Sequence, residues 1–176
     1  MTIPEIDSAL DTLTVLVDTR EQDTPLFRKR MRAVGFPTKR QKLNFGDYSC
    51  SVMADGAEID LSASFAIERK MSLDELAQCY TRGRKRFERE FERCKAAGGK
   101  MYLLIEGASW EGAYNGLYRT QMHPHSLIAS MTAWLARYNC QILMCKAETT
   151  PNLMHDICYR EAKEHLERMC SNESNL

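Results

Sequence analysis

The stretch from Phe65 to Asp74, FAIERKMSLD, joins a buried strand directly to a capped helix. Its first half has the apolar content of a strand, and the letters SLDE that begin at Ser72 have the spacing of a capping box. A helix is therefore expected to follow the strand at once. Side chains two apart in a strand share a face, so Glu68 and Lys70 point one way and Arg69 points the other. The stretch predicts a strand that carries an acid and a base together at its end.

Strand and helix patterns alternate on both sides of this stretch. Toward the N-terminus, an apolar strand at 15–17 ends in a polar run, and Pro25 opens an amphipathic helix that Gly35 ends. Further strands, with a turn at Asp55-Gly56, are expected to form a small meander. The meander strands are at 38–43, 48–53 and 64–69, and the later elements are helices at 83–97, 126–138 and 152–169 and strands at 101–105 and 141–144. This alternation predicts an α/β fold with a mixed central sheet flanked by helices.

Composition limits the class of protein. The 176 residues, 44% hydrophobic and 27% charged, suit one globular domain, which we place at 14–170 between an N-terminal extension at 1–13 and a frayed tail at 171–176. No apolar run reaches the length of a membrane span, and the first residues do not resemble a signal peptide, so a cytoplasmic protein without membrane contact is expected. The seven cysteines include no C-x-x-C pair, which favours reduced thiols over disulfides or a zinc site.

Two carboxylates and an ammonium group are candidates for a catalytic metal site. Gly46-Asp47 is separated from Glu68 by twenty residues, and the two carboxylates and Lys70 converge if Asp47 lies on a neighbouring strand. Mg²⁺ takes oxygen ligands and keeps several waters, so one or two carboxylates and a substrate phosphate suit it. A metal polarises the phosphoryl oxygen and lowers the pKa of its water, while a lysine stabilises developing charge. The pattern predicts phosphodiester hydrolysis; the alternative is a solvated strand without function.

Four further residues are candidates for supporting this site. Asp18, at the end of the first expected strand, is a third possible metal ligand, and Glu21 is either a ligand or a support for one. Asp74 either supports the site or offsets the dipole of the helix that begins beside it. Arg69 either makes a functional contact or forms an ordinary ion pair. The residue pattern leaves these alternatives open.

Basic residues cluster locally although the formal net charge is zero. Between Thr24 and Gly46 there are seven basic residues and no acid, and arginines recur along the expected helix at 83–97. Phosphate groups of DNA are the natural partners of such residues, although a solvated face, or pairing with the glutamates interleaved on the helix, explains them equally. The candidate DNA-contacting residues are Lys39, Arg40, Lys42, Arg82, Arg84, Arg86, Arg89 and Arg93.

The combined pattern GD...ERKxxxD resembles the motif of XPF-type structure-specific endonucleases, a branch of the restriction-endonuclease-like superfamily. The run Val17-Asp18-Thr19-Arg20-Glu21 is similar to that family's V-D-x-R-E element, and Gly83-Arg84 and Leu103 to Glu106 resemble its following helix and strand. The resemblance spans roughly residues 15–138. It implies a mixed sheet of the restriction-endonuclease type and a Mg²⁺ cofactor that Mn²⁺ replaces. It also implies that Asp18, Asp47 and Glu68 bind the metal, that Lys70 assists the attacking water, and that Glu21, Arg69 and Asp74 support the site.

The resemblance also sets expectations for substrate and partners. Family substrates are branched DNAs such as flaps and forks, which implies a role in DNA repair, recombination or replication. Family members commonly carry helix-hairpin-helix units after the nuclease domain, and residues 149–176 are too few for that module. A homodimer, as in the family, or a helix-hairpin-helix-bearing partner is therefore expected. The chain resembles the stand-alone domains of phages, mobile elements and bacteria. The alternatives are a non-catalytic DNA-binding subunit of a nuclease complex, or a restriction or phage-recombination nuclease acting on duplex or ends.

Overall fold

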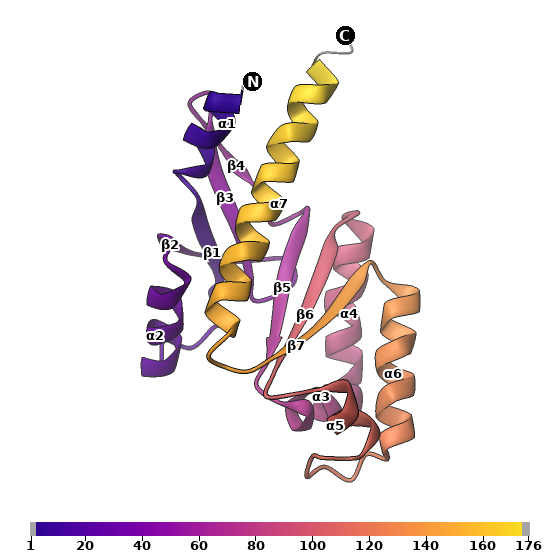
Figure 1. Cartoon of the computed structure of the whole chain (residues 1–176). Coiled ribbons are helices and arrows are strands. Elements are labelled where there is room, and N and C mark those ends of the chain that lie inside the picture. The colour runs from indigo at the N-terminus through magenta and orange to yellow at the C-terminus, as the bar shows by residue number, and fades with distance from the viewer. Residues whose placement is uncertain (1–2, 174–176) are drawn as a thin grey trace. The chain divides into compact units, whose positions relative to one another are not determined.

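Alternating strands and helices assemble into two compact units in the computed structural model, which describes residues 3 to 173 (Figure 1). Unit 1 is formed by the residues up to 43, by 48–62 and by the residues from 151 onward. Unit 2 is formed by residues 44–47 and 63–150. No helix of the described chain is long and apolar enough to cross a membrane.

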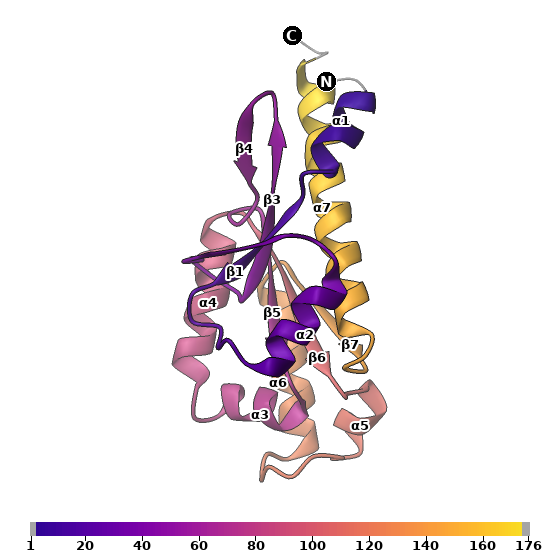
Figure 2. The same ribbon diagram turned by 90° about the vertical axis from the view of Figure 1, so that its left-hand side faces the viewer.

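Unit 1 is built on a mixed sheet. Strand β1 pairs in parallel with β2, where Val15 lies opposite Thr38, and in antiparallel fashion with β3. Strands β3 and β4 form a hairpin, closed by Asp55 and Gly56, both at positive φ as a tight hairpin turn requires (Figure 2). The unit 1 elements are α1 (Ile3–Leu10), β1 (Thr14–Asp18), α2 (Pro25–Val34), β2 (Thr38–Gln41), β3 (Tyr48–Ala54), β4 (Ala57–Asp60) and, except for its first residue, α7 (Thr150–Glu173).

Helices of unit 1 pack on this sheet. The buried Cys50 thiol of β3 donates to the Cys158 carbonyl of α7 at 3.6 Å, which places α7 against β3. His155 of α7 bonds the Val34 carbonyl at 2.8 Å and stacks on Phe36, so α7 also holds the end of α2. Helix α1 lies within the expected N-terminal extension and contacts β3. Helix α7 continues through Glu173, into the segment expected to fray, and residues 174–176 lie outside the described chain.

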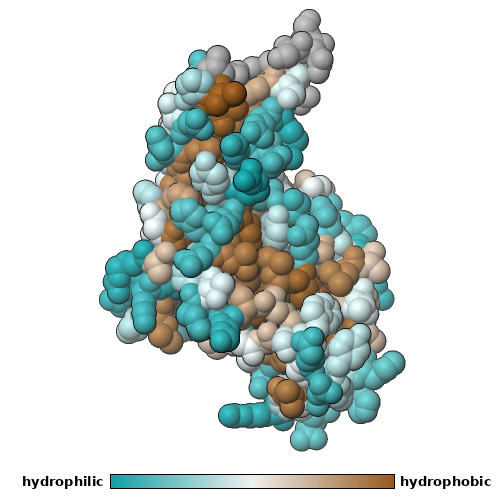
Figure 3. All heavy atoms as spheres, in the orientation of Figure 1, coloured by the Kyte–Doolittle hydropathy of each residue, from teal (hydrophilic) through white to brown (hydrophobic). Residues whose placement is uncertain are grey.

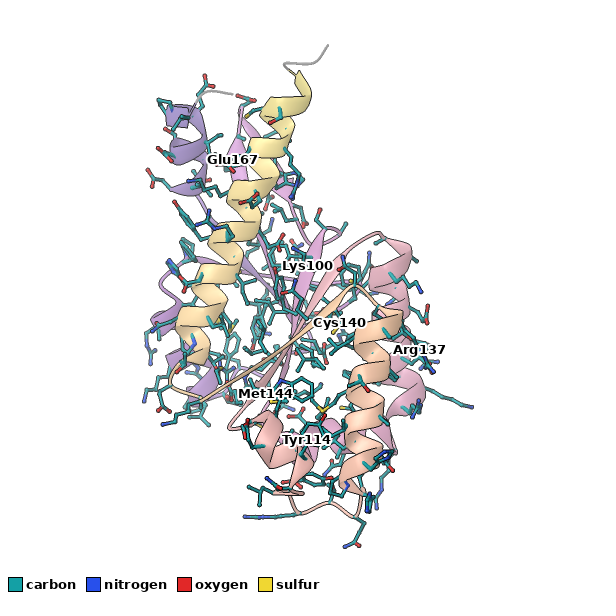
Figure 4. All side chains as sticks on the ribbon, turned by 45° about the vertical axis from the view of Figure 1, so that its right-hand side comes forward. Lys100, Tyr114, Arg137, Cys140, Met144 and Glu167 are labelled. Carbon is teal, nitrogen blue, oxygen red and sulfur yellow. The ribbon has the colours of Figure 1, made fainter. Side chains whose placement is uncertain are left out.

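Unit 2 contains a parallel three-stranded arrangement with helices. Strand β6 pairs in parallel with both β5 and β7, so the carboxyl ends of all three strands point the same way. In Figure 4, Lys100 and Cys140, at the starts of β6 and β7, lie toward the opposite end from Met144 and Tyr114. The unit 2 elements are β5 (Phe65–Lys70), α3 (Leu73–Tyr80), α4 (Arg84–Ala96), β6 (Lys100–Glu106), α5 (Trp110–Tyr114), α6 (Pro124–Arg137) and β7 (Cys140–Cys145).

The core of unit 2 is aromatic. The indole ring of Trp134, fully buried on α6, lies 4.9 Å from the ring of Tyr80 and 6.0 Å from that of Phe87, measured between centroids. Phe91 and Tyr138 complete the group. Aromatic pairs at these separations stabilise beyond the area that they bury. The cluster therefore fixes α3, α4 and α6 on the face of β5 that carries Glu68 and Lys70.

The structure confirms the α/β class with a mixed sheet flanked by helices and corrects the expected meander. Strand β2 pairs in parallel with β1 because α2 intervenes between them and returns the chain in the same direction. The antiparallel partner that follows β3 is β4, a short, largely exposed strand that the sequence analysis did not separate from the turn. Helix α5 lies between the strand expected at 101–105 and the helix expected at 126–138, where no helix was expected, and its cap is Ser109.

Candidate active site

Glu68 and Lys70 form a buried ion pair on one face of β5. The ammonium of Lys70 donates to Glu68 Oε1 at 2.7 Å, and the two side chains are only 10% and 8% exposed. Two buried charges cost free energy unless each has a partner, so this pairing is what allows both to remain charged. The strand thus delivers a carboxylate and an ammonium group to one point at its carboxyl end.

The ammonium of Lys70 has further neighbours. Its Nζ lies 3.8 Å from Glu75 Oε1 and 5.3 Å from the ring centroid of Phe87 on α4. Burial alone would lower the pKa of Lys70, but the charges of Glu68 and Asp47 outweigh it and hold that pKa above its ordinary value. Lys70 is therefore a fixed cation at neutral pH.

Asp47 is fastened to β5 on both sides of Glu68. Its N–H donates to the Ile67 carbonyl at 2.9 Å, and its Oδ2 accepts the N–H of Arg69 at 2.8 Å. Both bonds go to the neighbours of Glu68, so the two carboxylate-bearing residues are held side by side. Gly46 makes this approach possible, because its φ is 71° and an added Cβ would lie 2.6 Å from the Cβ of Ala66.

Replacing Gly46 by alanine should therefore displace Asp47 from β5. The left-handed backbone costs an alanine about 1 kcal/mol, and the clash should add about 1 to 3 kcal/mol of overpacking. Gly107→Ala is the matched control, since Gly107 also has positive φ (60°) and nothing within 4 Å of its added Cβ. Thermal unfolding should show the larger loss for Gly46→Ala; equal losses would mean that the contact with Ala66 is unimportant.

Arg69 points to the other face of β5 and pairs with Glu106. Its Nε and Nη2 donate to the two carboxylate oxygens of Glu106 at 2.8 and 2.6 Å, with side-chain exposures of 11% and 8%. This two-pronged, largely buried geometry is the strong form of an arginine–carboxylate contact. The structural ion pair left open by the sequence is therefore present, and it joins the ends of β5 and β6.

Asp74 lies in the first turn of α3, as the dipole alternative requires, and it also holds a loop. Its Oδ1 accepts the N–H groups of Arg119 and Thr120 at 2.6 and 2.9 Å. The first turn of α3 is capped instead by Ser72, whose Oγ accepts the Glu75 N–H, while Glu75 returns a bond to the Met71 N–H at 2.7 Å. Asp74 thus ties the segment between α5 and α6 to the chain that leaves β5.

Asp18 and Glu21 belong to unit 1, where each is hydrogen-bonded. Asp18 Oδ1 accepts bonds from the main chain and side chain of Arg20, and its Oδ2 accepts the Leu43 N–H at 2.7 Å. Burial would raise the pKa of Asp18, but these bonds outweigh it and hold that pKa below its ordinary value. Glu21 accepts the Tyr48 hydroxyl at 2.6 Å.

The candidate DNA-contacting residues divide by their partners. Among residues 3–173, Arg82, Arg86 and Arg89 are exposed and have no ion pair. Arg93 instead pairs with Glu90 at 2.7 Å. The remaining candidates have other neighbours. Arg84 lies 5.5 Å from the Trp134 ring centroid, Lys39 bonds both oxygens of Glu58, Arg40 donates to the Glu21 carbonyl, and Lys42 is exposed.

The donor set of unit 2 fits a hard divalent cation. The described residues contain no group of three or more His, Cys, Asp or Glu side chains arranged to hold a metal ion. Asp47 and Glu68 nevertheless place two carboxylates side by side, and Mg²⁺ commonly takes one or two protein carboxylates and completes its shell with water and phosphate oxygens. These two residues are the ones in unit 2 that would hold such an ion.

Comparison with known proteins identifies the family. The profile of the ERCC4 domain matches residues 17–157, which is most of the chain and includes every residue of the GD...ERKxxxD pattern. This chain belongs to the ERCC4 domain family. The XPF-type nuclease domain expected from the motif is confirmed.

A solved structure shows the same fold as this ERCC4 domain. XPF from Aeropyrum pernix is similar with a TM-score of 0.61 and 21% sequence identity, over 84% of this chain and 61% of that one. The ERCC4 domain described here thus spans about three fifths of the length of that protein. A comparison with curated proteins finds no match.

The sequence did not indicate that three further residues lie next to the candidate site of this ERCC4 domain. Glu106 neutralises Arg69, Glu75 approaches Lys70, and the Phe87 ring lies beside the same ammonium. The capping-box position of Glu75 and the apolar helix face of Phe87 were visible as structural features only. For Glu106, the signal was a charge at the end of a largely apolar, buried strand, a place that favours a partnered carboxylate.

Proposed function

We propose that this ERCC4 domain is a Mg²⁺-dependent DNA endonuclease that hydrolyses phosphodiesters of branched DNA, such as flaps and forks, in DNA repair, recombination or replication. The observation that carries the proposal is the side-by-side arrangement of Asp47 and Glu68 on β5, with the Lys70 ammonium 2.7 Å from Glu68. Membership of the ERCC4 domain family supports the nuclease assignment, and the two carboxylates support the choice of Mg²⁺.

The residues of unit 2 have separate tasks in this hydrolysis. Asp47 and Glu68 would hold Mg²⁺, which when bound polarises a phosphoryl oxygen and lowers the pKa of a water molecule. Lys70 holds positive charge beside Glu68 and stabilises the negative charge that develops on the phosphate. Arg69 and Asp74 position the end of β5 and the loop that follows α5. The metal role of Asp18 and the supporting role of Glu21 stay predictions from the sequence.

Exposed arginines on helix α4 support DNA as the substrate. Phe87, whose ring lies beside the Lys70 ammonium, is in the first turns of α4, and the exposed residues Arg86 and Arg89 are on the same helix. Neither arginine has an ion-pair partner in the described chain, so both are available to phosphate groups. Lys39 and Arg93, each bonded to a glutamate, are less available.

Reversing Arg86 and Arg89 to glutamate should weaken DNA binding and flatten its salt dependence. Each phosphate contact contributes about 0.9 to the slope of log K against log salt, so the double variant should lose about 2 from that slope. The control reverses Arg160 and Lys163 of α7, which lie within 4.0 Å of glutamate partners on their own helix. Fluorescence anisotropy at several salt concentrations measures both slopes, and an unchanged slope for the α4 variant would remove these arginines from the DNA surface.

The proposed activity is tested directly by cleavage. Labelled flap, fork, bubble, single-stranded and plain duplex DNAs should be incubated with wild type and Asp47→Ala, in Mg²⁺, in Mn²⁺ and in EDTA. We expect metal-dependent cutting of the branched DNAs by wild type alone. Cutting only of duplex or ends would favour a restriction or recombination nuclease, and binding without cutting would favour a non-catalytic subunit. Sedimentation of the protein tests the homodimer expected from the family resemblance, and addition of a helix-hairpin-helix protein tests the alternative partner.

A further inference from the structure

Three of the four exposed large apolar side chains in the described part of unit 2 lie near the carboxyl ends of its strands, and the fourth, Leu135, lies near the end of α6. Among the described residues of unit 2, the large hydrophobic side chains that are exposed are Met71, Tyr114, Leu117 and Leu135. Met71 directly follows β5, and Tyr114 and Leu117 lie at the end of α5 and just after it. Tyr114 and Leu117 are 63% and 73% exposed, so most of each side chain takes no part in packing the core. Figure 3 shows hydrophobic atoms within the otherwise hydrophilic lower end, where Figure 1 places α3 and α5.

This apolar tip, defined here as Tyr114 and Leu117, is held in a fixed place. The Leu117 N–H donates to the Gly112 carbonyl at 2.8 Å, and a Cβ added at Gly112 would touch both Leu117 and Leu73, so these side chains lie close together. Two residues later, the Arg119 N–H donates to Asp74 at 2.6 Å. Asp74 is only four positions after Lys70, so the tip is braced against the chain that leaves the catalytic strand.

The surroundings of the apolar tip suit a polyanion. From Asn115 to Ser126 the chain contains no acid, and it carries Arg119, His123 and His125, all exposed. An apolar tip bordered by an arginine and two histidine side chains fits a ligand that offers flat apolar faces and negative charge together. A nucleic acid strand whose bases are unstacked has both features, whereas the bases of a closed duplex are hidden in the stack.

We infer that Tyr114 and Leu117 contact the unpaired nucleobase next to the cut, so that this tip selects branched DNA over plain duplex. The inference rests on the proposed endonuclease function, and it assigns the choice of substrate to a surface separate from Asp47, Glu68 and Lys70. Tyr114 offers an aromatic face on which a base stacks, and Leu117 offers an aliphatic edge against the terminal base pair. Asp74 positions the tip through the loop backbone and does not touch the DNA.

The test measures base contact without cleavage. A flap DNA carrying 2-aminopurine at its first unpaired position is titrated with Asp47→Ala protein, with and without the added pair Tyr114→Ser and Leu117→Ser. Stacking should quench the fluorescence of 2-aminopurine, and the pair should abolish the quenching. It should also weaken flap binding about tenfold, a loss within the range for one base stacked on an aromatic side chain, and leave duplex binding unchanged.

Matched controls separate the possible outcomes. Leu26→Ser changes an equally exposed leucine of α2, 73% exposed, and should alter neither signal. Circular dichroism checks folding, and Leu117→Ser alone should give a partial effect. Unchanged quenching in the double variant overturns the inference, and so does an equal loss of affinity for flap and duplex DNA. In either case, cleavage of DNA by wild type still supports the proposed function. If wild type neither binds nor cuts any DNA, the proposed function itself fails.

Discussion

Glu68→Gln should lower the rate of DNA cleavage by about a thousandfold, because a metal-bound phosphate gains several kcal/mol in the transition state and each 1.36 kcal/mol is a factor of ten. Glutamine keeps the size of the side chain and an oxygen that can accept a hydrogen bond from the Lys70 ammonium. In wild type that ammonium lies 2.7 Å from Glu68 Oε1. The substitution removes the negative charge that Mg²⁺ requires. Single-turnover cleavage of flap DNA at several Mg²⁺ concentrations measures the loss, and higher Mg²⁺ should recover part of it.

Glu75→Gln is the matched control for this prediction. Glu75 also faces Lys70, at 3.8 Å, and glutamine preserves the bond that it accepts from the Met71 N–H. If Glu68 serves only as a counter-ion for Lys70, the two substitutions should have similar effects. If Glu68 is a metal ligand, Glu75→Gln should cost at most about 10- to 100-fold, the usual loss when a residue that orients a ligand is changed. Equal losses in the two variants would contradict the ligand role.

The local part of the fold could be predicted from the sequence because its causes are local. The capping box at Ser72 predicted the start of α3, and Gly35 predicted the end of α2. What the sequence did not show is which strands pair. Strand β2 lies parallel to β1 because α2, between them, brings the chain back to the start of β1. Neither strand has a sequence pattern that indicates which strand it pairs with. Short, largely exposed elements such as β4 also escape, since they have no buried face to produce a period.

The candidate site divides in the same way. Two-residue periodicity was enough to place Glu68 and Lys70 on one face and Arg69 on the other. The convergence of Asp47 with Glu68 was conditional on a neighbouring strand, and the structure holds Asp47 against β5 by two hydrogen bonds to the β5 backbone, which no side-chain pattern encodes. The partner of Arg69 lies 37 residues later, and only the parallel pairing of β5 with β6 brings it near.

Glu106→Leu should destabilise the protein by about 3 kcal/mol or more, because it strands a buried guanidinium. Arg69 and Glu106 are about nine-tenths buried and exchange two hydrogen bonds, so neither charge has water to replace a lost partner. Urea unfolding monitored by tryptophan fluorescence suits the measurement, since the fully buried Trp134 reports on unit 2. Glu88→Leu, which removes the partner of Arg137 in a pair 4.0 Å apart and far more exposed, should cost less than about 1 kcal/mol.

The double variant Arg69→Met with Glu106→Leu decides what the pair is for. Replacing a whole buried ion pair by apolar side chains of similar volume is often neutral or stabilising, so most of the lost stability should return. Cleavage should not return if the guanidinium also orients the end of β5, whose Arg69 N–H holds Asp47 at 2.8 Å. Recovery of both stability and cleavage would instead mean that packing alone holds this strand end. A double variant no more stable than Glu106→Leu would show that the loss comes from the leucine and not from the unpaired arginine.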